Sequence, residues 1–191
     1  MSQNFWSSKD LEPKRQFRFL ISLQPGVSQT ELQFACKTAD RPSYTIGEQE
    51  HRFFNHTFYY PGRMNWNTVG MTLVDAITPG STELLYEYLS DIGVQQPRDF
   101  GEATSTTITK ESAVNSLGDV KIKELGTSGT NETRIIGEWS LINAFITEVN
   151  FGAHSYDSDE MVEISLTLRY DWAQYKKMAG QGSKLRPPKG G

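Results

Sequence analysis

Hydrophobic and polar residues alternate along most of this chain, which is the pattern of β-strands that bury one face. The first alternating run places four apolar side chains on one face: Phe17, Phe19, Ile21 and Leu23. Turn-forming residues 24–26 end this run. A second run carries Leu32, Phe34 and Cys36 on one face. The short loop between the two runs predicts that they pair as a hairpin.

Residues 44–60 differ from the rest, because they mix polar with aromatic residues and contain few aliphatic side chains. Two interpretations stay open for strands of this kind. Their faces or edges are completed by another copy of the chain, or they belong to an ordinary sandwich with aromatic cross-strand pairs. A turn at Pro61 and Gly62 follows, and alternation resumes over residues 64–76.

The spacing of apolar residues then changes to that of a helix, with five on one helical face: Leu84, Leu85, Tyr88, Leu89 and Ile92. Ser81 or Thr82 is expected to cap the N-terminus of this helix. Glu83 interacts favourably with the positive end of the helix dipole in the first turn, and Gly93 can end the helix at its C-terminus. Residues 95–109 are polar and predict a long surface loop, with a short helical turn near residues 111–115.

Strands return in the second half of the chain, over residues 120–123, 134–142, 145–151 and 162–170. In the third of these, alternation places Phe145, Thr147, Val149 and Phe151 on one face. The pattern therefore predicts seven to nine strands and one α-helix. This is a mainly β fold, an antiparallel β-sandwich or barrel with a helix lying against it.

The length of 191 residues suits one domain with appendages. We expect an N-terminal extension over residues 1–13, a β-sandwich domain over residues 14–172, and a flexible basic tail over residues 173–191. Hydrophobic residues make up 37% of the chain, which is enough for a core. No run of eighteen apolar residues occurs, and the first eleven residues lack the apolar stretch of a signal peptide. We therefore expect that the protein is made in the cytoplasm and does not insert into a membrane.

The formal net charge is −4, but it is unevenly distributed, because five bases and no acids follow Asp171. The body is consequently acidic, which argues against wrapping DNA, since Lys and Arg supply most of the affinity for phosphate. The basic tail fits either a contact with an acidic partner surface or a solvated terminus.

Signatures of catalysis are missing from the sequence, since it contains no G-x-S-x-G, no P-loop and no zinc-binding spacing. Cys36 lies in an alternating run and is interpreted as a small buried hydrophobe. His51 and His56 are expected on opposite faces of a regular strand, which argues against a shared metal. The acidic residues within 155–160 fit a solvated turn better than a calcium loop. We expect no catalytic residue, cofactor or metal.

Two segments carry a resemblance to a known family when they are taken in order along the chain. The first spans residues 61–75 (PGRMNWNTVGMTLVD), after the strand that ends near Cys36 and the pair Arg41 and Pro42. The second comprises residues 137–145 (GEWSLINAF) followed by residues 163–171 (EISLTLRYD). Together they resemble the tail tube proteins of contractile-tailed bacteriophages, over roughly residues 14–172.

The resemblance implies a β-sandwich subunit that forms hexameric rings, in which strands of six copies close into one barrel around a lumen. Stacked rings would form the tube of a virion tail through which DNA passes without specific binding. It further implies tail sheath, baseplate and tape-measure proteins as partners. By this analogy the segment over residues 44–60 helps to form the lumen wall, with one face toward the channel and the other toward the packed sandwich.

An acidic body suits a DNA conduit, because a wall of like charge offers the phosphates no strong binding site. Glu48 and Glu50 are the candidate lumen-facing acids. The two ends of the chain are candidates for contacts between rings, through five residues: Phe5, Trp6, Lys176, Lys177 and Arg186. The same ends would alternatively adapt the subunit to a specialised ring at the baseplate.

Three other functions stay open from the sequence. A tube-initiator ring at the baseplate and the inner tube of a contractile injection system would share the same fold. A ligand-binding β-sandwich would instead use Trp66, Trp139 and surface tyrosines as stacking platforms. An enzyme is the weakest alternative, because the sequence announces no convergent polar groups.

Overall fold

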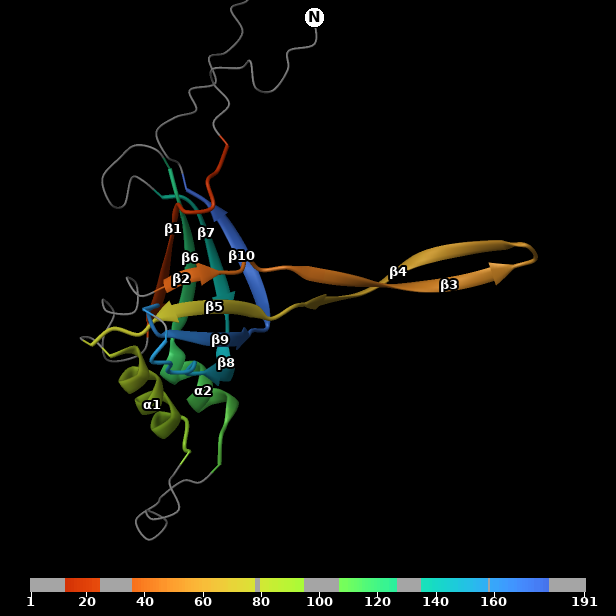
Figure 1. The fold of residues 1–191 in the computed structure, drawn as a ribbon. Coiled ribbons are helices and arrows are strands. Elements are labelled where there is room, and N and C mark those ends of the chain that lie inside the picture. Colours follow the sequence, from red (N-terminus) through yellow and green to blue (C-terminus); the bar gives the residue numbers. More distant parts are fainter. Residues whose placement is uncertain are drawn as a thin grey trace, which may run out of the picture.

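The computed structural model describes residues 13–24, 36–77, 80–94, 107–126, 135–157 and 159–178. Two four-stranded antiparallel sheets form the body, and a long two-stranded hairpin projects from it (Figure 1). The strands of the two sheets cross at a steep angle, and two helices lie at one end of the body (Figure 1). The predicted mainly β, antiparallel fold is confirmed. Within the described residues of one chain the strands do not close into a barrel.

The first sheet has the order β1-β6-β7-β10. Its strands are β1 (Phe19–Gln24), β6 (Asp119–Leu125), β7 (Ile135–Ile142) and β10 (Trp172–Lys177). The second sheet has the order β2-β5-β9-β8. Its strands are β2 (Cys36–Ala39), β5 (Val69–Val74), β8 (Phe145–Asn150) and β9 (Glu163–Arg169). The projecting hairpin consists of β3 (Tyr44–Phe53) and β4 (His56–Trp66).

The core lies between the sheets and is filled by the alternating apolar residues that the sequence singled out. Five side chains of this set have almost no exposed surface: Ile21, Val69, Leu73, Ile164 and Leu168. The helices α1 (Ser81–Asp91) and α2 (Lys110–Leu117) add buried residues at the end of the sandwich. These are Leu85, Tyr88, Ile92, Ala113 and Leu117.

The hairpin predicted between the first two runs is wrong. β1 pairs with β6, whereas β2 pairs with β5 in the other sheet. Alternation reports which face of a strand is buried but not which strand lies beside it. In a sandwich, two strands that follow each other in the chain can therefore lie in opposite sheets.

The helical expectations hold with two changes. Gly80, not Ser81 or Thr82, is the N-cap of α1, and no side chain of the cap residue bonds to the helix. Asp75 takes over this role, because its carboxylate accepts the Thr82 backbone N–H at 3.3 Å and the Thr82 hydroxyl at 2.6 Å. The helical turn expected near residues 111–115 is the full helix α2, so the described residues contain two helices where one was predicted. A capping box between Thr109 and Ser112 starts it.

Two strands depart from the predicted pattern. β8 has a register shift between Ile146 and Glu148, so Phe145 and Ile146 both pack against the core and the alternation through Thr147 is broken. At the C-terminal end, β10 pairs with β7 from Trp172 to Lys177. The folded body therefore continues beyond residue 172, where the basic tail was expected to start.

Candidate assembly surfaces

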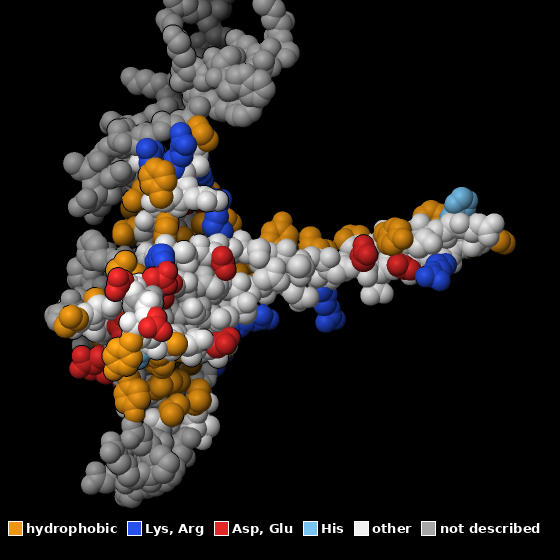
Figure 2. Space-filling model, viewed as in Figure 1, with side chains coloured by type: hydrophobic (Ala, Val, Ile, Leu, Met, Phe, Trp, Pro, Cys, Tyr) orange, Lys and Arg blue, Asp and Glu red, His pale blue; other side chains and the backbone are white. Residues whose placement is uncertain are grey.

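The hairpin formed by β3 and β4 leaves both of its faces outside the body of its own chain. Every residue of β3 is exposed, and so is every residue of β4 except Trp66. Large apolar side chains are common along it (Figure 2): Tyr44, Ile46, Phe53, Phe54, Phe58, Tyr59, Tyr60 and Met64. A two-stranded hairpin is at best marginally stable alone in water, and apolar surface of this extent marks an interaction site.

The position of the hairpin corrects the expectation for residues 44–60. The face that was expected to pack on the sandwich has no partner within the described residues of the chain. The register also corrects the expectation for the histidines. His51 lies opposite Phe58, and Phe53 lies opposite His56. Because residues 51 and 53 share a face of β3, both histidines lie on the same face of the hairpin.

The base of the hairpin is fixed to the body by hydrogen bonds and aromatic contacts. The Asn67 amide nitrogens bond to Ser43, with the backbone N–H donating to the Ser43 carbonyl at 2.9 Å and Nδ2 donating to Oγ at 3.0 Å. Trp66 packs edge to face on Tyr44, with ring centroids 5.4 Å apart, and lies 6.0 Å from Tyr170 of the body. These contacts hold the direction in which the hairpin leaves the body.

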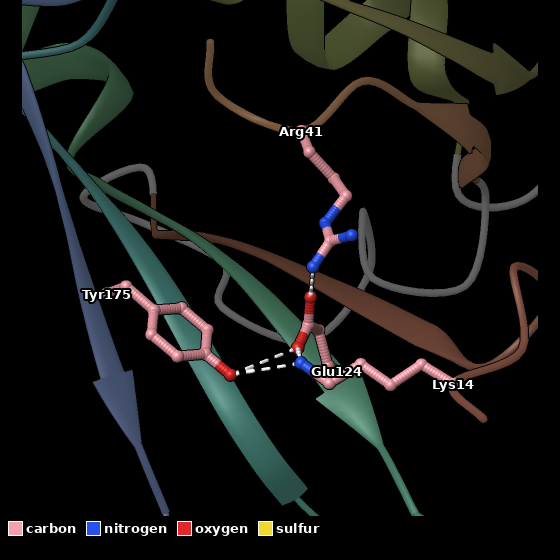
Figure 3. Close-up of polar contacts among 4 residues, drawn as sticks. All are labelled: Lys14, Arg41, Glu124 and Tyr175. Atoms are coloured by element: carbon pink, nitrogen blue, oxygen red, sulfur yellow. Dashed lines mark hydrogen bonds and ion pairs between the residues drawn. The ribbon is translucent and has the colours of Figure 1, made fainter. Parts of the chain in front are cut away.

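A second anchor is the cluster around Glu124 at the end of β6 (Figure 3). One carboxylate oxygen of Glu124 pairs with Lys14 and the other with Arg41. The Tyr175 hydroxyl of β10 donates to the same carboxylate at 3.2 Å and accepts from Lys14 at 3.1 Å. The cluster thus connects the residues before β1 and the strand β10, which lie at the two edges of the first sheet, to the segment that leads into β3.

The side chain of Glu124 is only 11% exposed, whereas those of Lys14 and Arg41 are 49% and 61% exposed. Burial alone would raise the pKa of Glu124, but the hydrogen bond from Lys14 and the charge of Arg41 outweigh it, so the pKa lies below its ordinary value. The same hydrogen bond raises the pKa of Lys14. The cluster is therefore ionised at neutral pH and stabilises the folded state.

A cleft of about 560 Å³ opens beside this cluster, between the start of β1, the end of β6 and the segment from β2 to β3. Its apolar lining comes from Phe17, Phe19, Ile122, Leu125 and Ile136. Its basic residues are Lys14, Arg15, Arg18, Lys37 and Arg41. Only Asp40 and Glu124 among its lining residues are acidic, so the cleft is basic within an acidic body.

The edges of both sheets form a further surface for assembly. Among the described strands, β1 and β10 end the first sheet, and β2 and β8 end the second. The edge of β8 is covered in one place, where the Ile146 N–H donates to the Tyr88 hydroxyl of α1 at 3.4 Å. Edge strands with free backbone groups are templates for pairing with another chain.

The predicted site residues fall in different parts of the molecule. Glu48 and Glu50 lie opposite Pro61 and Tyr59 on one face of the hairpin, and Glu50 pairs with Arg52 at 3.2 Å. Their role in a lumen stays a prediction. Lys176 and Lys177 lie in β10, opposite Glu138 and Gly137.

Three of the predicted contacts between rings, Phe5, Trp6 and Arg186, lie outside the described residues. The contact role of Lys176 and Lys177 stays a prediction as well. The Glu124 cluster and the cleft had no signal in the sequence, because their residues come from segments far apart in the chain.

The described residues also bear on metal binding, membrane insertion and ligand stacking. No group of three or more His, Cys, Asp or Glu side chains among them could hold a metal ion. Neither described helix has the length and hydropathy of a membrane span. Burial raises the pKa of the Cys36 thiol to about 11. Trp66 lies between two tyrosines, and Trp139 packs on Tyr175 with centroids 4.8 Å apart, so both rings are engaged within the fold.

The fold is that of tube and terminator proteins of contractile injection systems, so the resemblance to tail tube proteins is confirmed at the level of the fold. The structure is similar to the sheath/tube terminator of an extracellular contractile injection system (PVC), with a TM-score of 0.62 and 16% identity over 87% of this chain and 98% of that one. The anti-feeding prophage cap, a tube-terminating cap, gives a TM-score of 0.60 and 19% identity over 88% and 93%. A chain of the anti-feeding prophage baseplate gives a TM-score of 0.59 and 15% identity over 87% of this chain and 97% of that one. No protein-family model and no curated protein sequence matches the chain.

Proposed function

We propose that this protein is a structural, non-enzymatic subunit that assembles with copies of itself into hexameric rings of a contractile tail or injection particle. The rings stack into the tube that conducts the cargo. The observation that carries this proposal is the exposed hairpin of β3 and β4. Its base is fixed to the body, its aromatic side chains are exposed, and nothing covers it within the described residues of its own chain. Copies of the chain would cover it and pair the edges of the two sheets.

The cargo proposed from the sequence is viral DNA, which places the protein in the tail of a virion. Tail sheath, baseplate and tape-measure proteins are then its partners. An acidic subunit supports this role, because phosphates are repelled by a wall of the same charge. The similar structures named above come from injection particles, so the tube of such a particle is part of the same proposal.

A ring that ends the tube is a second candidate function. It is favoured by the match to a sheath/tube terminator, of which this chain covers 98%. The two functions differ in their assembly, because a tube subunit can stack on itself without limit and a terminal ring offers a stacking surface on one side only.

Electron microscopy of the purified full chain tests both functions. Stacked rings with a central channel are expected for a tube subunit, and single or paired rings for a terminal subunit. Particles of one chain without a channel, at every concentration up to the millimolar range, would refute both.

A further inference from the structure

The tip of the hairpin carries two unfavourable features. Phe54 at the turn has φ +51°, a left-handed conformation that is uncommon for a bulky residue and unfavourable relative to Gly or Asn. Its side chain is also 89% exposed, and its ring lies 4.5 Å from that of Phe53, which is 59% exposed. An aromatic residue at this position gains little in the isolated subunit. Both features are explained if the tip enters an apolar site.

The cleft beside Glu124 matches such a tip in size and lining. Its volume of about 560 Å³ falls within the range of roughly 300–1,000 Å³ typical of binding clefts. Phe17 is 76% exposed at the cleft, and Phe19, Leu125 and Ile136 add apolar lining. Basic side chains gather at the same end of the body, next to exposed hydrophobic ones (Figure 2).

The charges of the two surfaces are opposite. Five basic and two acidic side chains line the cleft, and one of the bases, Lys37, is paired with Glu163 outside it. Behind the aromatic tip, β3 carries Glu48 and Glu50 on one face, with Arg52 as the basic residue of that face. A tip inserted into the cleft would bring these carboxylates to its basic rim, where opposite charges favour association.

The tip cannot fill the cleft of its own chain. Arg41 of the cleft precedes Tyr44, the first residue of β3, by only three positions, so the cleft lies at the base of the hairpin. Ten strand residues span about 34 Å, which separates the tip from this base. The base is fixed by the contacts of Ser43 and Trp66 described above. The occupant must therefore come from another molecule.

We propose that the hairpin tip of one copy, residues 51–58, docks into this cleft of a second copy, with Glu48 and Glu50 against its basic rim. The proposal rests on the proposed self-assembly and names the two surfaces that meet. Because the donor and acceptor surfaces differ, the contact is head to tail and can repeat from copy to copy. It assigns Glu48 and Glu50 to a contact between subunits in place of the lumen.

Complementary variants test this contact. The donor variant is Phe54→Asn with Glu50→Lys, since Asn tolerates the left-handed conformation and keeps the turn. The acceptor variant is Arg15→Glu with Phe17→Ser, which leaves the Glu124 cluster intact. Each variant should raise the Kd of self-association by roughly 100-fold, as expected for the loss of an aromatic hot spot. Sedimentation velocity measures the association, and thermal unfolding checks that each variant is folded.

Mixing the two variants gives the decisive result. The acceptor variant keeps an intact tip and the donor variant keeps an intact cleft, so one productive contact can form between them. At a concentration between the wild-type Kd and the raised Kd, the mixture should give a 1:1 complex that does not grow further, while each variant alone remains monomeric. Tyr156→Ser is the matched control, because Tyr156 is fully exposed and lies outside both surfaces. This control should assemble like the wild type.

Several results would overturn the proposal. If the donor and acceptor variants form rings as readily as the wild type, the tip docks elsewhere while the proposed tube function stands. If removing residues 1–12 abolishes assembly and the tip variants do not, that segment occupies the cleft instead. If the wild type itself never associates, the proposed function fails together with this contact.

Discussion

Replacing Glu124 by Gln isolates the contribution of its charge, because glutamine has nearly the same shape. The substitution removes the partner of Lys14 and Arg41 and leaves two cations at the base of the hairpin. A hydrogen bond to a charged group contributes about 1.5–3 kcal/mol. Glu124 accepts three such bonds, from Lys14, Arg41 and Tyr175. Both cations are about half exposed or more and can return to water, so most of the combined contribution of these bonds is screened. We expect Glu124→Gln to lower the free energy of unfolding by about 2 kcal/mol at pH 7.

The pH dependence provides the sharper form of this prediction. The pKa of Glu124 is lower in the folded protein than in an ordinary carboxyl group. Its contribution to stability is therefore complete above the unfolded pKa of about 4.3 and disappears as the pH falls through the lower folded value. Urea unfolding of wild type and Glu124→Gln should show a constant difference from pH 7 to about pH 5, and a shrinking difference below that.

The control is Glu148→Gln on β8, because this side chain is exposed. It should change the unfolding free energy by less than about 0.5 kcal/mol at any of these pH values. A Glu124→Gln variant as stable as the wild type at pH 7 would refute the cluster as an anchor. A difference that persists unchanged to pH 2 would refute its electrostatic origin.

Three further predictions concern packing. Gly137→Ala should lower the unfolding free energy by about 2 kcal/mol in urea titrations, because its Cβ would lie 2.2 Å from the Tyr175 hydroxyl; an unchanged midpoint would contradict this. Cys36 should react with iodoacetamide at pH 8 more than about 100-fold slower in the folded than in the unfolded protein, because burial raises the pKa of its thiol to about 11, and equal rates would show an open thiol. Tyr88→Phe should cost about 1 kcal/mol of thermal stability, since its hydroxyl donates to the Ala113 carbonyl at 3.3 Å; a variant with an unchanged Tm would show that this bond contributes nothing.

The buried face of several core strands could be read from the sequence, but the partners of the strands could not. Ile21 and Ile164 are buried as the alternation predicted. The same alternation suggested that the first run pairs with the run ending at Cys36, whereas these strands lie in different sheets. Strand pairing depends on contacts between distant segments, and a pattern along one segment carries no information about them.

The hairpin of β3 and β4 illustrates a different limit. Its polar and aromatic composition correctly separated residues 44–60 from the core strands. A segment exposed on both faces has no buried side to fix an alternation, so its projection from the body had no sequence signal. The bond of Glu124 to Lys14 joins residues 110 positions apart. Neither residue has neighbours in the chain that would have indicated this contact.

Hydrogen exchange of residues 44–66 in dilute and in assembled protein tests the central claim most directly. In the dilute subunit the hairpin amides should exchange rapidly, because the hairpin has no cover within the described residues of its own chain. In assembled particles the same amides should become protected by at least about 100-fold, while the core strands β5 and β9 change little. Assembled particles in which residues 44–66 exchange as fast as in the dilute subunit would contradict the claim that copies of this chain complete its surface.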